Sequence, residues 1–357
     1  MTEEPIPRQM KALLKREPVP SFTLETIDVP VDLIDDEVLI RVEFAGICGS
    51  DIKVCNWTPQ AATVNNLPLI LGHECAGVVV KTGPKASLAV GQRVCVESHL
   101  FCGCCYVCEH GAREICPNMA QFGHGKGSIY GGCAEYTKVA DKFCYPLKTS
   151  IGAREAVLLE PLGVVHNGLS RLDIKDEDIL ITGCGTIGLL AISVAKVLGA
   201  KRIIAMDIKD DKLEMAKKMG ADDVINSSVV DVHDVIMDMT QKYGVGRICE
   251  CTGVPAVVNK IFHLLRPAGK VTLIGMPKEA VHIEKPMTTI MYRALQVNTV
   301  FGRRIWNSWV ESERLVAEGK VDVNAVITHQ MPMTQYEDAF KALMGGDACK
   351  ILMEPGK

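Results

Sequence analysis

The sequence lacks a long hydrophobic run, an excess of positive charge and an apolar N-terminal leader. No apolar run approaches the ~20 residues that a helix needs to cross a bilayer. The formal net charge of -4 gives no electrostatic reason for binding to nucleic acid or to an anionic membrane. The N-terminal stretch MTEEPIPRQMK is polar and has no signal-peptide core. We therefore expect a cytoplasmic protein whose partners are neither nucleic acid nor membrane.

The overall composition is that of an ordinary globular protein, with 48% hydrophobic and 23% charged residues. A chain of 357 residues is about twice the length of a typical domain, so two domains are expected. Cysteine is abundant, and its number, 15, is odd, so complete pairing within one chain is impossible. In the absence of a secretory leader, this usage favours free thiols and metal binding over disulfides.

Four cysteines near residue 110 have the spacing of a metal site, C-x2-C-x2-C-x7-C. The short x2 spacings let thiolates on a tight turn face one ion, and the longer return loop completes a tetrahedron, which is typical of a closed structural zinc site. A loop of free thiols or a redox switch is the alternative, but such a loop would oxidise readily. Cys104 is out of register and is interpreted as a bystander. The predicted ligands are Cys102, Cys105, Cys108 and Cys116.

A second candidate metal site is spread over three short segments, CGSD, GHE and EPLG. Cys48 alone could be a buried apolar residue and His73 alone a structural histidine, but one thiolate, one imidazole and the carboxylates of Glu74 and Glu160 together favour an open catalytic zinc site. Which of the two carboxylates ligates the metal directly stays open. Zinc in such a site polarises an alcohol oxygen and lowers its pKa. Ser50 could pass the alcohol proton onward, with a simple turn residue as the alternative.

From residue 178 the pattern changes to alternating strands and helices, which indicates a doubly wound parallel sheet. The apolar run DILITG, for example, is typical of a strand buried on both faces. Strands are predicted at 178–183, 202–207, 222–228, 247–253 and 269–276, and helices at 189–200, 212–220, 231–243 and 256–265.

The segment GCGTIG stands between the first strand and the first helix of this region. Alone the pattern is weak evidence, but here it occupies the turn at which a helix N-terminus binds a pyrophosphate. Asp207 follows Gly188 by 19 positions, where an acid hydrogen-bonds the adenosine ribose and repels a 2'-phosphate. NAD is therefore favoured over NADP, with Lys209 as the feature that supports NADP. The predicted cofactor-binding residues here are Gly183, Gly185, Thr186, Ile187, Gly188 and Asp207.

The ordered set CGSD, GHE, the four-cysteine cluster, GGCAEY, EPLG, GCGTIG and ITH resembles the zinc-containing medium-chain dehydrogenases, in the branch of the threonine and sorbitol dehydrogenases. The resemblance implies an α/β protein in which a GroES-like β-rich catalytic domain (1–155 and 300–357) encloses a Rossmann NAD-binding domain (156–299). It also implies one catalytic and one structural zinc per subunit and a homotetramer, or else a homodimer. On this resemblance Cys48, His73 and Glu74 match catalytic-zinc residues, and Glu160 matches the nearby acid.

One position departs from the family pattern, because Lys53 stands where relatives usually carry the histidine that ends the proton relay. Lys53 could move protons if its pKa were depressed, could attract an anionic group of the substrate, or could simply extend into solvent. Arg303 is predicted to face the cofactor or a substrate anion, with a solvated or interface arginine as the alternative. His124 and Lys126 are interpreted as loop residues, although they could line the mouth of the active site.

The leading hypothesis is an NAD-dependent zinc oxidoreductase that transfers a hydride between NAD and a secondary alcohol with a neighbouring polar group, such as a threonine-like amino alcohol or a polyol. A dehydrogenase of small hydroxy compounds with a phosphate or sulfonate, held by Lys53, is one alternative. A non-catalytic NAD-binding protein or zinc-thiol redox sensor is an alternative of another class. A zinc-less reductase is disfavoured by the cysteine cluster and GHE.

Overall fold

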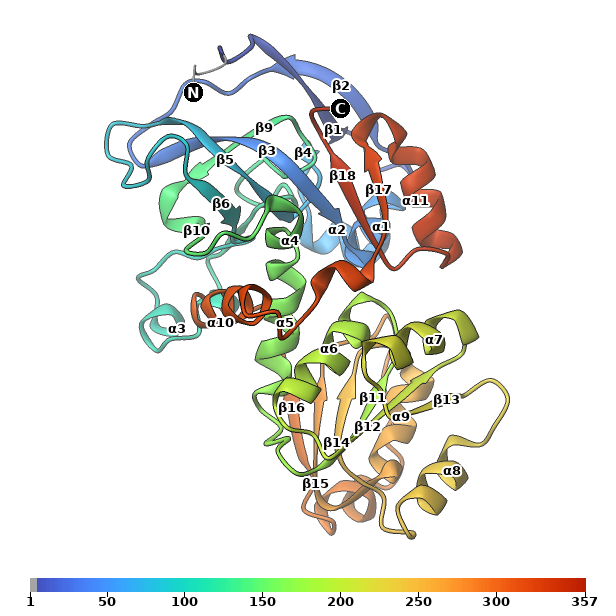
Figure 1. Ribbon diagram of the computed structural model, residues 1–357. Coiled ribbons are helices and arrows are strands. Elements are labelled where there is room, and N and C mark those ends of the chain that lie inside the picture. Colours follow the sequence, from blue (N-terminus) through green and yellow to red (C-terminus); the bar gives the residue numbers. More distant parts are fainter. Residues whose placement is uncertain (1–4) are drawn as a thin grey trace. The chain divides into compact units, whose positions relative to one another are not determined.

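The computed structural model describes residues 5–357, which divide into two compact units (Figure 1). The first unit comprises the described residues up to Glu160 together with Ile305–Ala317 and Ile327–Lys357, and the second comprises Pro161–Arg304 and Glu318–Val326. Glu318–Val326, which the sequence assigned to the catalytic domain, packs with the second unit. The domain boundaries at 155 and 300 stay a prediction. Among the described residues, no helix is long and apolar enough to cross a membrane.

The first unit is built around β3 (Glu37–Ile47), whose apolar residues are buried along most of its length. β3 pairs antiparallel with β5 (Glu74–Thr82), β9 (Tyr136–Ala140) and β18 (Lys350–Glu354). The sheet order is β10-β6-β5-β3-β18-β17, with β9 paired to β3 off this path. Smaller sheets are β2-β1-β4 and β7-β8. The other strands are β1 (Gln9–Lys15), β2 (Thr23–Asp28), β4 (Leu69–Ile70), β6 (Arg93–Val96), β7 (His99–Leu100), β8 (Ala120–Gln121), β10 (Cys144–Pro146) and β17 (Ile327–Pro332).

Short helices connect these strands. They are α1 (Gly49–Cys55), α2 (Pro59–Val64), α3 (Tyr106–Glu109), α4 (Ala153–Ala156), α10 (Asn307–Ala317) and α11 (Tyr336–Gly345), with the 3-10 turns η1 (Arg113–Ile115), η2 (Asp141–Phe143) and η5 (Met333–Gln335). α5 (Leu159–Leu169) begins in the first unit and continues into the second.

The register of the three central strands brings the candidate site residues to one edge of the sheet. Gly46, near the end of β3, is opposite Glu74, the first residue of β5. Ile47 is opposite Ile351, near the start of β18. Because both neighbours run antiparallel to β3, its end lies beside their beginnings. Residues that follow β3 and residues that open β5 and β18 therefore meet at this edge.

The second unit contains a six-stranded parallel sheet within residues 161–304, with the order β13-β12-β11-β14-β15-β16 (Figure 1). This topology confirms the predicted α/β class. The strands are β11 (Asp178–Thr182), β12 (Arg202–Asp207), β13 (Asp223–Asn226), β14 (Val245–Glu250), β15 (Leu265–Leu273) and β16 (Gln296–Thr299). The helices are α6 (Thr186–Val197), α7 (Asp210–Met219), α8 (Val232–Met239) and α9 (Pro255–Leu264), with a π-helical turn η3 (Met287–Met291) and a 3-10 turn η4 (Val323–Val326).

The prediction of a helix over 231–243 is wrong at its C-terminal end, because α8 ends at Met239. The hydroxyl of Thr240 donates to the carbonyl of Ile236 over 2.6 Å, and this bond competes with continuation of the helix. Gln241 and Lys242 then adopt positive φ angles of 53° and 69°, which right-handed helix cannot accommodate.

Candidate active site and metal centres

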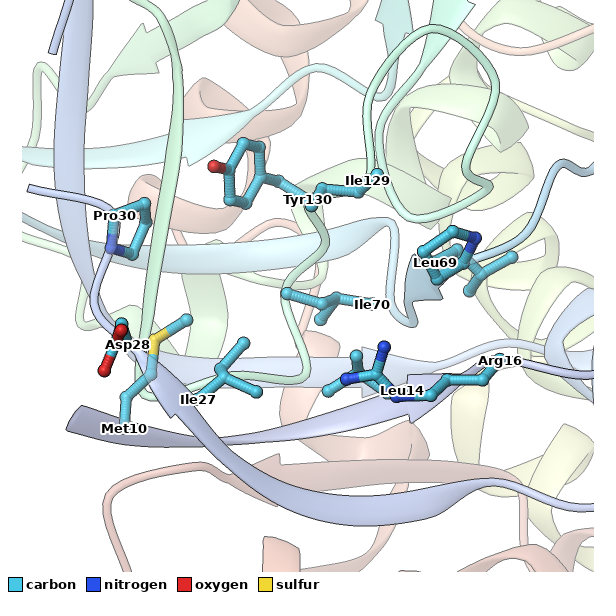
Figure 2. Close-up of a pocket in the computed structure, with 11 residues that line it drawn as sticks. Met10, Leu14, Arg16, Ile27, Asp28, Pro30, Leu69, Ile70, Ile129 and Tyr130 are labelled. Carbon is cyan, nitrogen blue, oxygen red and sulfur yellow. The ribbon is translucent and has the colours of Figure 1, made fainter. Parts of the chain in front are cut away.

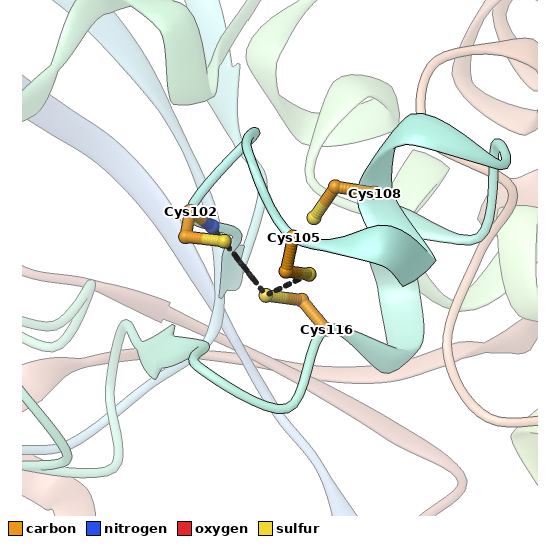
Figure 3. A group of neighbouring side chains, drawn as sticks. All are labelled: Cys102, Cys105, Cys108 and Cys116. Atoms are coloured by element: carbon orange, nitrogen blue, oxygen red, sulfur yellow. Dashed lines mark hydrogen bonds between the residues drawn. The ribbon is translucent and has the colours of Figure 1, made fainter.

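The four predicted thiols converge on one point in a lobe of the first unit (Figure 3). The Sγ atom of Cys116 lies 3.5 Å from that of Cys102 and 3.8 Å from that of Cys105. Zinc–sulfur bonds of about 2.3 Å in a tetrahedron place the sulfurs about 3.8 Å apart, so the spacing fits zinc. All 15 cysteines lie within the described residues and are free thiols, and Cys104 is exposed. The group therefore has the geometry of a zinc site and not of a disulfide.

The lobe is anchored to the core by two of its own ligands. Cys108 and Cys116 are buried and belong to the apolar cluster that includes Phe101 and Phe122. The guanidinium of Arg113 lies 5.1 Å from the centre of the Phe101 ring. A backbone hydrogen bond from Cys104 lowers the pKa of the Cys102 thiol to about 6, which favours the thiolate that a metal requires. Cys104, interpreted from the sequence as a bystander, thus contributes its backbone amide to the lobe.

Cys48, His73 and Glu74 form the second group, and their ligand atoms all lie within 4.8 Å of one another. Cys48 follows β3, and the His73–Glu74 pair opens β5, so the sheet register produces the cluster. His73 and Glu74 are buried, and Cys48 is half-buried. One thiolate, one imidazole and one carboxylate form a donor set that fits a catalytic zinc ion with a position left for substrate.

Asp51, which the sequence analysis did not single out, holds two members of this group in place. Its Oδ2 accepts a hydrogen bond from the backbone amide of Cys48 over 2.8 Å, and its Oδ1 lies 3.4 Å from Nδ1 of His73. The Asp51 side chain is fully buried. Burial raises the pKa of Asp51, but His73, the backbone amide of Cys48 and His124 together outweigh burial, and the pKa is lowered overall. A carboxylate on one ring nitrogen leaves the other nitrogen of His73 for a metal.

Lys350 is the second site residue that the sequence analysis missed. Its Nζ donates to both carboxylate oxygens of Glu74, over 2.6 and 2.7 Å, and to the carbonyl of Ile47 over 3.1 Å. Burial lowers the pKa of Lys350, but Glu74 outweighs it and raises the pKa overall. Gly46 makes room for the pair, because a Cβ there would lie 2.0 Å from Oε2 of Glu74.

The remaining predicted catalytic residues surround this group without joining it. Burial raises the pKa of Glu74, and the charge of the nearby Glu160 raises it further. Glu160 is itself buried, but it is outside the set that could share one ion. Its role as a ligand stays a prediction. Ser50 and Lys53 lie on α1, and Nζ of Lys53 donates to Oε1 of Gln60 over 3.0 Å.

His124 stacks on His73, with ring centroids 5.0 Å apart and an angle of 26° between the ring planes. Its Nδ1 lies 3.0 Å from Oδ1 of Asn65, whose own amide nitrogen donates to the carbonyl of Ala61 over 2.8 Å. Desolvation by burial, and then the nearby His73, lower the pKa of His124 to about 3. The structure therefore places His124, interpreted from the sequence as a loop residue, beside the candidate zinc ligands. Lys126 in the same loop is exposed.

The glycine-rich turn of the second unit joins β11 to α6 in the predicted way. Gly183 has φ of +84°, and a Cβ on Gly188 would lie 1.7 Å from the carbonyl oxygen of Gly183, so this turn requires glycine at both positions. Gly185 precedes the helix, and Thr186 and Ile187 open it, so their backbone amides lie in its first turn. Such a turn offers N–H donors to a phosphate.

Asp207, at the end of β12, is bonded to the same turn. Its Oδ2 accepts from the amide of Cys184 over 2.7 Å, and its Oδ1 accepts from the amides of Ile208 and Lys209 over 2.7 and 3.0 Å. These three bonds fix the direction of the carboxylate. Arg303 is fully buried, and its predicted contact with a cofactor or a substrate anion stays a prediction.

A separate pocket lies on the sheet formed by β2, β1 and β4 (Figure 2). Apolar side chains such as Leu14, Ile27 and Ile70 line it, and Tyr130 and Arg16 stand at its rim. None of the predicted catalytic, cofactor-binding or metal-binding residues lines this pocket.

Comparison with known proteins agrees with this geometry. Residues 34–149 match the alcohol dehydrogenase GroES-like domain, and residues 186–318 match the zinc-binding dehydrogenase family. L-threonine 3-dehydrogenase of Pyrococcus abyssi is 36% identical over 346 residues, which cover 96% of this chain and 98% of the relative. Galactitol-1-phosphate dehydrogenase of Escherichia coli has a similar structure, with a TM-score of 0.88, 26% identity and coverage of 97% of this chain and 100% of that one.

An alcohol dehydrogenase of Escherichia coli CFT073, solved with NADH, is similar to the same degree, with a TM-score of 0.88, 26% identity and coverage of 98% and 100% of the two chains. The family matches allow both groups of candidate metal ligands to be assigned. The four cysteines form a structural zinc site, and Cys48, His73 and Glu74 form a catalytic zinc site. The non-catalytic alternative is thereby set aside. The chain belongs to the zinc-binding medium-chain dehydrogenase family and is an oxidoreductase of the alcohol dehydrogenase type.

Proposed function

We propose that this enzyme oxidises a secondary alcohol with a neighbouring polar group, using NAD. The group of Cys48, His73 and Glu74, three donors that leave one position of a tetrahedral zinc ion for substrate, is the observation that carries the proposal. The similarity to the Pyrococcus abyssi L-threonine 3-dehydrogenase supports a threonine-like amino alcohol or a polyol as substrate. We further propose a homotetramer in the cytoplasm, whose subunits can be counted by light scattering on the purified enzyme.

In the proposed reaction each residue has a limited task. Cys48, His73 and Glu74 would hold a zinc ion that would lower the pKa of the substrate hydroxyl, and bound NAD would supply the hydride acceptor. Ser50, on the first turn of α1, accepts the hydroxyl proton and passes it to solvent. Asp51 orients His73, and Lys350 keeps the charge of Glu74 compensated in the protein interior. Glu160 stays close to this group as a further acid.

Asp207 supports NAD as the cofactor. Three backbone amides hold its carboxylate at the end of β12, next to the glycine-rich turn. A fixed carboxylate at this place accepts hydrogen bonds from ribose hydroxyls and repels the 2'-phosphate of NADP. Gly183, Gly185, Thr186, Ile187 and Gly188 bind the pyrophosphate in this proposal, and Arg303 completes the cofactor site.

A second candidate substrate class is a small hydroxy compound with a phosphate or sulfonate. Lys53 motivates it, because this cation replaces the usual relay histidine and lies on the helix that follows Cys48. Similarity to the Escherichia coli galactitol-1-phosphate dehydrogenase points the same way. Initial rates of NADH formation with threonine, polyols and anionic hydroxy compounds decide between the classes. A preference for the anions that disappears in Lys53→Ala would establish the second class.

Replacement of Cys48 tests the proposed chemistry as a whole. Cys48→Ser is expected to abolish NADH formation while NADH binding, measured by fluorescence, is retained, because the thiolate serves the metal and not the nucleotide. Cys104→Ser, at an exposed thiol outside both metal groups, is the matched control and is expected to keep full activity. Full activity in Cys48→Ser would remove the catalytic zinc from the proposal.

A further inference from the structure

The ring of His124 is held rigidly beside the catalytic group. Its neighbours Gly123 and Gly125 pack backbone against backbone, since a Cβ on Gly123 would lie 2.4 Å from the carbonyl oxygen of Gly72, and one on Gly125 would lie 1.9 Å from that of Asn66. The amide of Asn66 also donates to the carbonyl of His124 over 3.2 Å. The loop therefore fixes the position of the imidazole that stacks on His73.

Asn65 determines which nitrogen of His124 carries the proton. The amide nitrogen of Asn65 donates to the carbonyl of Ala61, so its oxygen Oδ1 is the atom that faces His124. An amide oxygen can only accept, so Nδ1 of His124 must donate to it over the 3.0 Å distance. In a neutral imidazole the other nitrogen, Nε2, then carries a lone pair and is a hydrogen-bond acceptor.

Nε2 of His124 is available to a ligand. Among the described residues, none donates a hydrogen bond to it, and it is absent from the buried polar atoms that lack a partner. The atom therefore keeps some solvent-accessible surface, although the ring itself is largely enclosed. An acceptor that is fixed in position and partly accessible, next to the candidate zinc ligands, is suited to accepting a hydrogen bond from one donor group of a bound molecule.

We propose that Nε2 of His124 accepts a hydrogen bond from a hydroxyl or ammonium group on the carbon next to the reacting alcohol. The assignment rests on the proposed function and specifies its neighbouring polar group as a donor.

His124→Phe tests this assignment, because phenylalanine keeps an aromatic ring against His73 and removes the acceptor. The substrates are 2,3-butanediol and 1-amino-2-propanol, which carry a hydroxyl or amino donor beside the alcohol, and 2-butanol, which carries none, each as both enantiomers. The measured quantity is kcat/KM for each donor substrate divided by kcat/KM for 2-butanol. Loss of one hydrogen bond to a fixed partner is expected to lower this ratio about tenfold.

The two donor substrates separate the two possible groups. If the ratio falls for the diol alone, the group that donates to Nε2 is a hydroxyl. If it falls for the amino alcohol alone, the donating group is an ammonium. If 2-butanol is not oxidised, its inhibition constant against the diol replaces its kcat/KM in the comparison. Zinc content of each variant is measured in parallel, so that loss of metal is recognised.

Asn65 provides a second, independent test through the tautomer. Asn65→Asp keeps an acceptor for Nδ1 of His124 and is expected to keep the preference for donor substrates over 2-butanol. Asn65→Leu removes this acceptor and is expected to reduce that preference. His233→Phe, at an exposed histidine at the start of α8, is the control and is expected to behave as wild type. An unchanged ratio in His124→Phe, or an equal fall for all three alcohols, would overturn the assignment. Absence of any turnover in the wild type would instead contradict the proposed function.

Discussion

Nζ of Lys350 lies 2.6 and 2.7 Å from the two carboxylate oxygens of Glu74, and both side chains are almost completely buried. These residues are 276 positions apart in the chain. The pair connects the start of β18 to the start of β5. Burial raises the pKa of Glu74, and Lys350 opposes this shift. The pair also explains why position 46 is a glycine, since any side chain there would collide with the carboxylate.

Lys350→Met is expected to destabilise the fold strongly, because it removes the ammonium group that donates to both oxygens of the buried Glu74 carboxylate. The expected loss in the free energy of unfolding is about 3 kcal/mol, measured by urea denaturation of the zinc-loaded enzyme. Lys85→Met, which removes the exposed ion pair with Asp35, is the control and is expected to cost less than about 1 kcal/mol. Equal stability of Lys350→Met and wild type would show that Glu74 does not depend on this lysine.

Asp51→Asn is expected to weaken zinc binding at the catalytic site and to spare the structural site. The carboxylate faces His73 over 3.4 Å, and loss of such a partner typically lowers metal affinity about 10- to 100-fold. The measurement is zinc per chain after dialysis against graded chelator concentrations, and the structural zinc of the same protein is the internal control. Retention of two zinc ions per chain at every concentration that leaves wild type fully loaded would contradict the role of Asp51.

Cys108→Ser and Cys104→Ser are expected to differ sharply although the two thiols are close in sequence. Cys108 points to the other three sulfurs and Cys104 is exposed (Figure 3). Cys108→Ser is therefore expected to reduce zinc from two ions to one per chain and to lower the melting temperature, whereas Cys104→Ser keeps both ions. Elemental analysis and calorimetry give the two quantities. Two zinc ions per chain in Cys108→Ser would rule out the four-thiolate site.

Asp207→Ser is expected to weaken discrimination between NAD and NADP. It removes the carboxylate that we propose faces the ribose, together with its bond to the amide of Cys184. Hydrogen bonds to a charged group are typically worth a factor of about 10 or more, so KM for NAD is expected to rise about tenfold, while that for NADP falls or stays constant. Asp211→Ser, at an exposed acid on α7, is the control. A parallel rise of both KM values would indicate damage to the loop and not loss of cofactor recognition.

The sequence by itself determined the features whose parts are close along the chain. The four zinc-lobe cysteines lie within 15 consecutive residues, and their spacing dictates a tetrahedral site because the backbone of tight turns has few options. The turn from Gly183 to Gly188 and the parallel strands around it were predictable for the same reason, since buried strands and glycine turns have local signatures. The end of the helix after Met239 was not, because one hydroxyl of Thr240 decided it.

Only the tertiary structure decided which distant side chains meet. The pairing of β3 with β5 and β18 brought Lys350 to Glu74. The position of α5 left Glu160 outside the group that could share one ion, and the loop after β8 placed His124 against His73. Asp51 follows Cys48 by three positions in the sequence, but its role depends on a contact with His73 that only the structure shows. The physical reason is that strands far apart in the sequence pair with one another, and this pairing decides which residues meet at a sheet edge. No local sequence pattern encodes it.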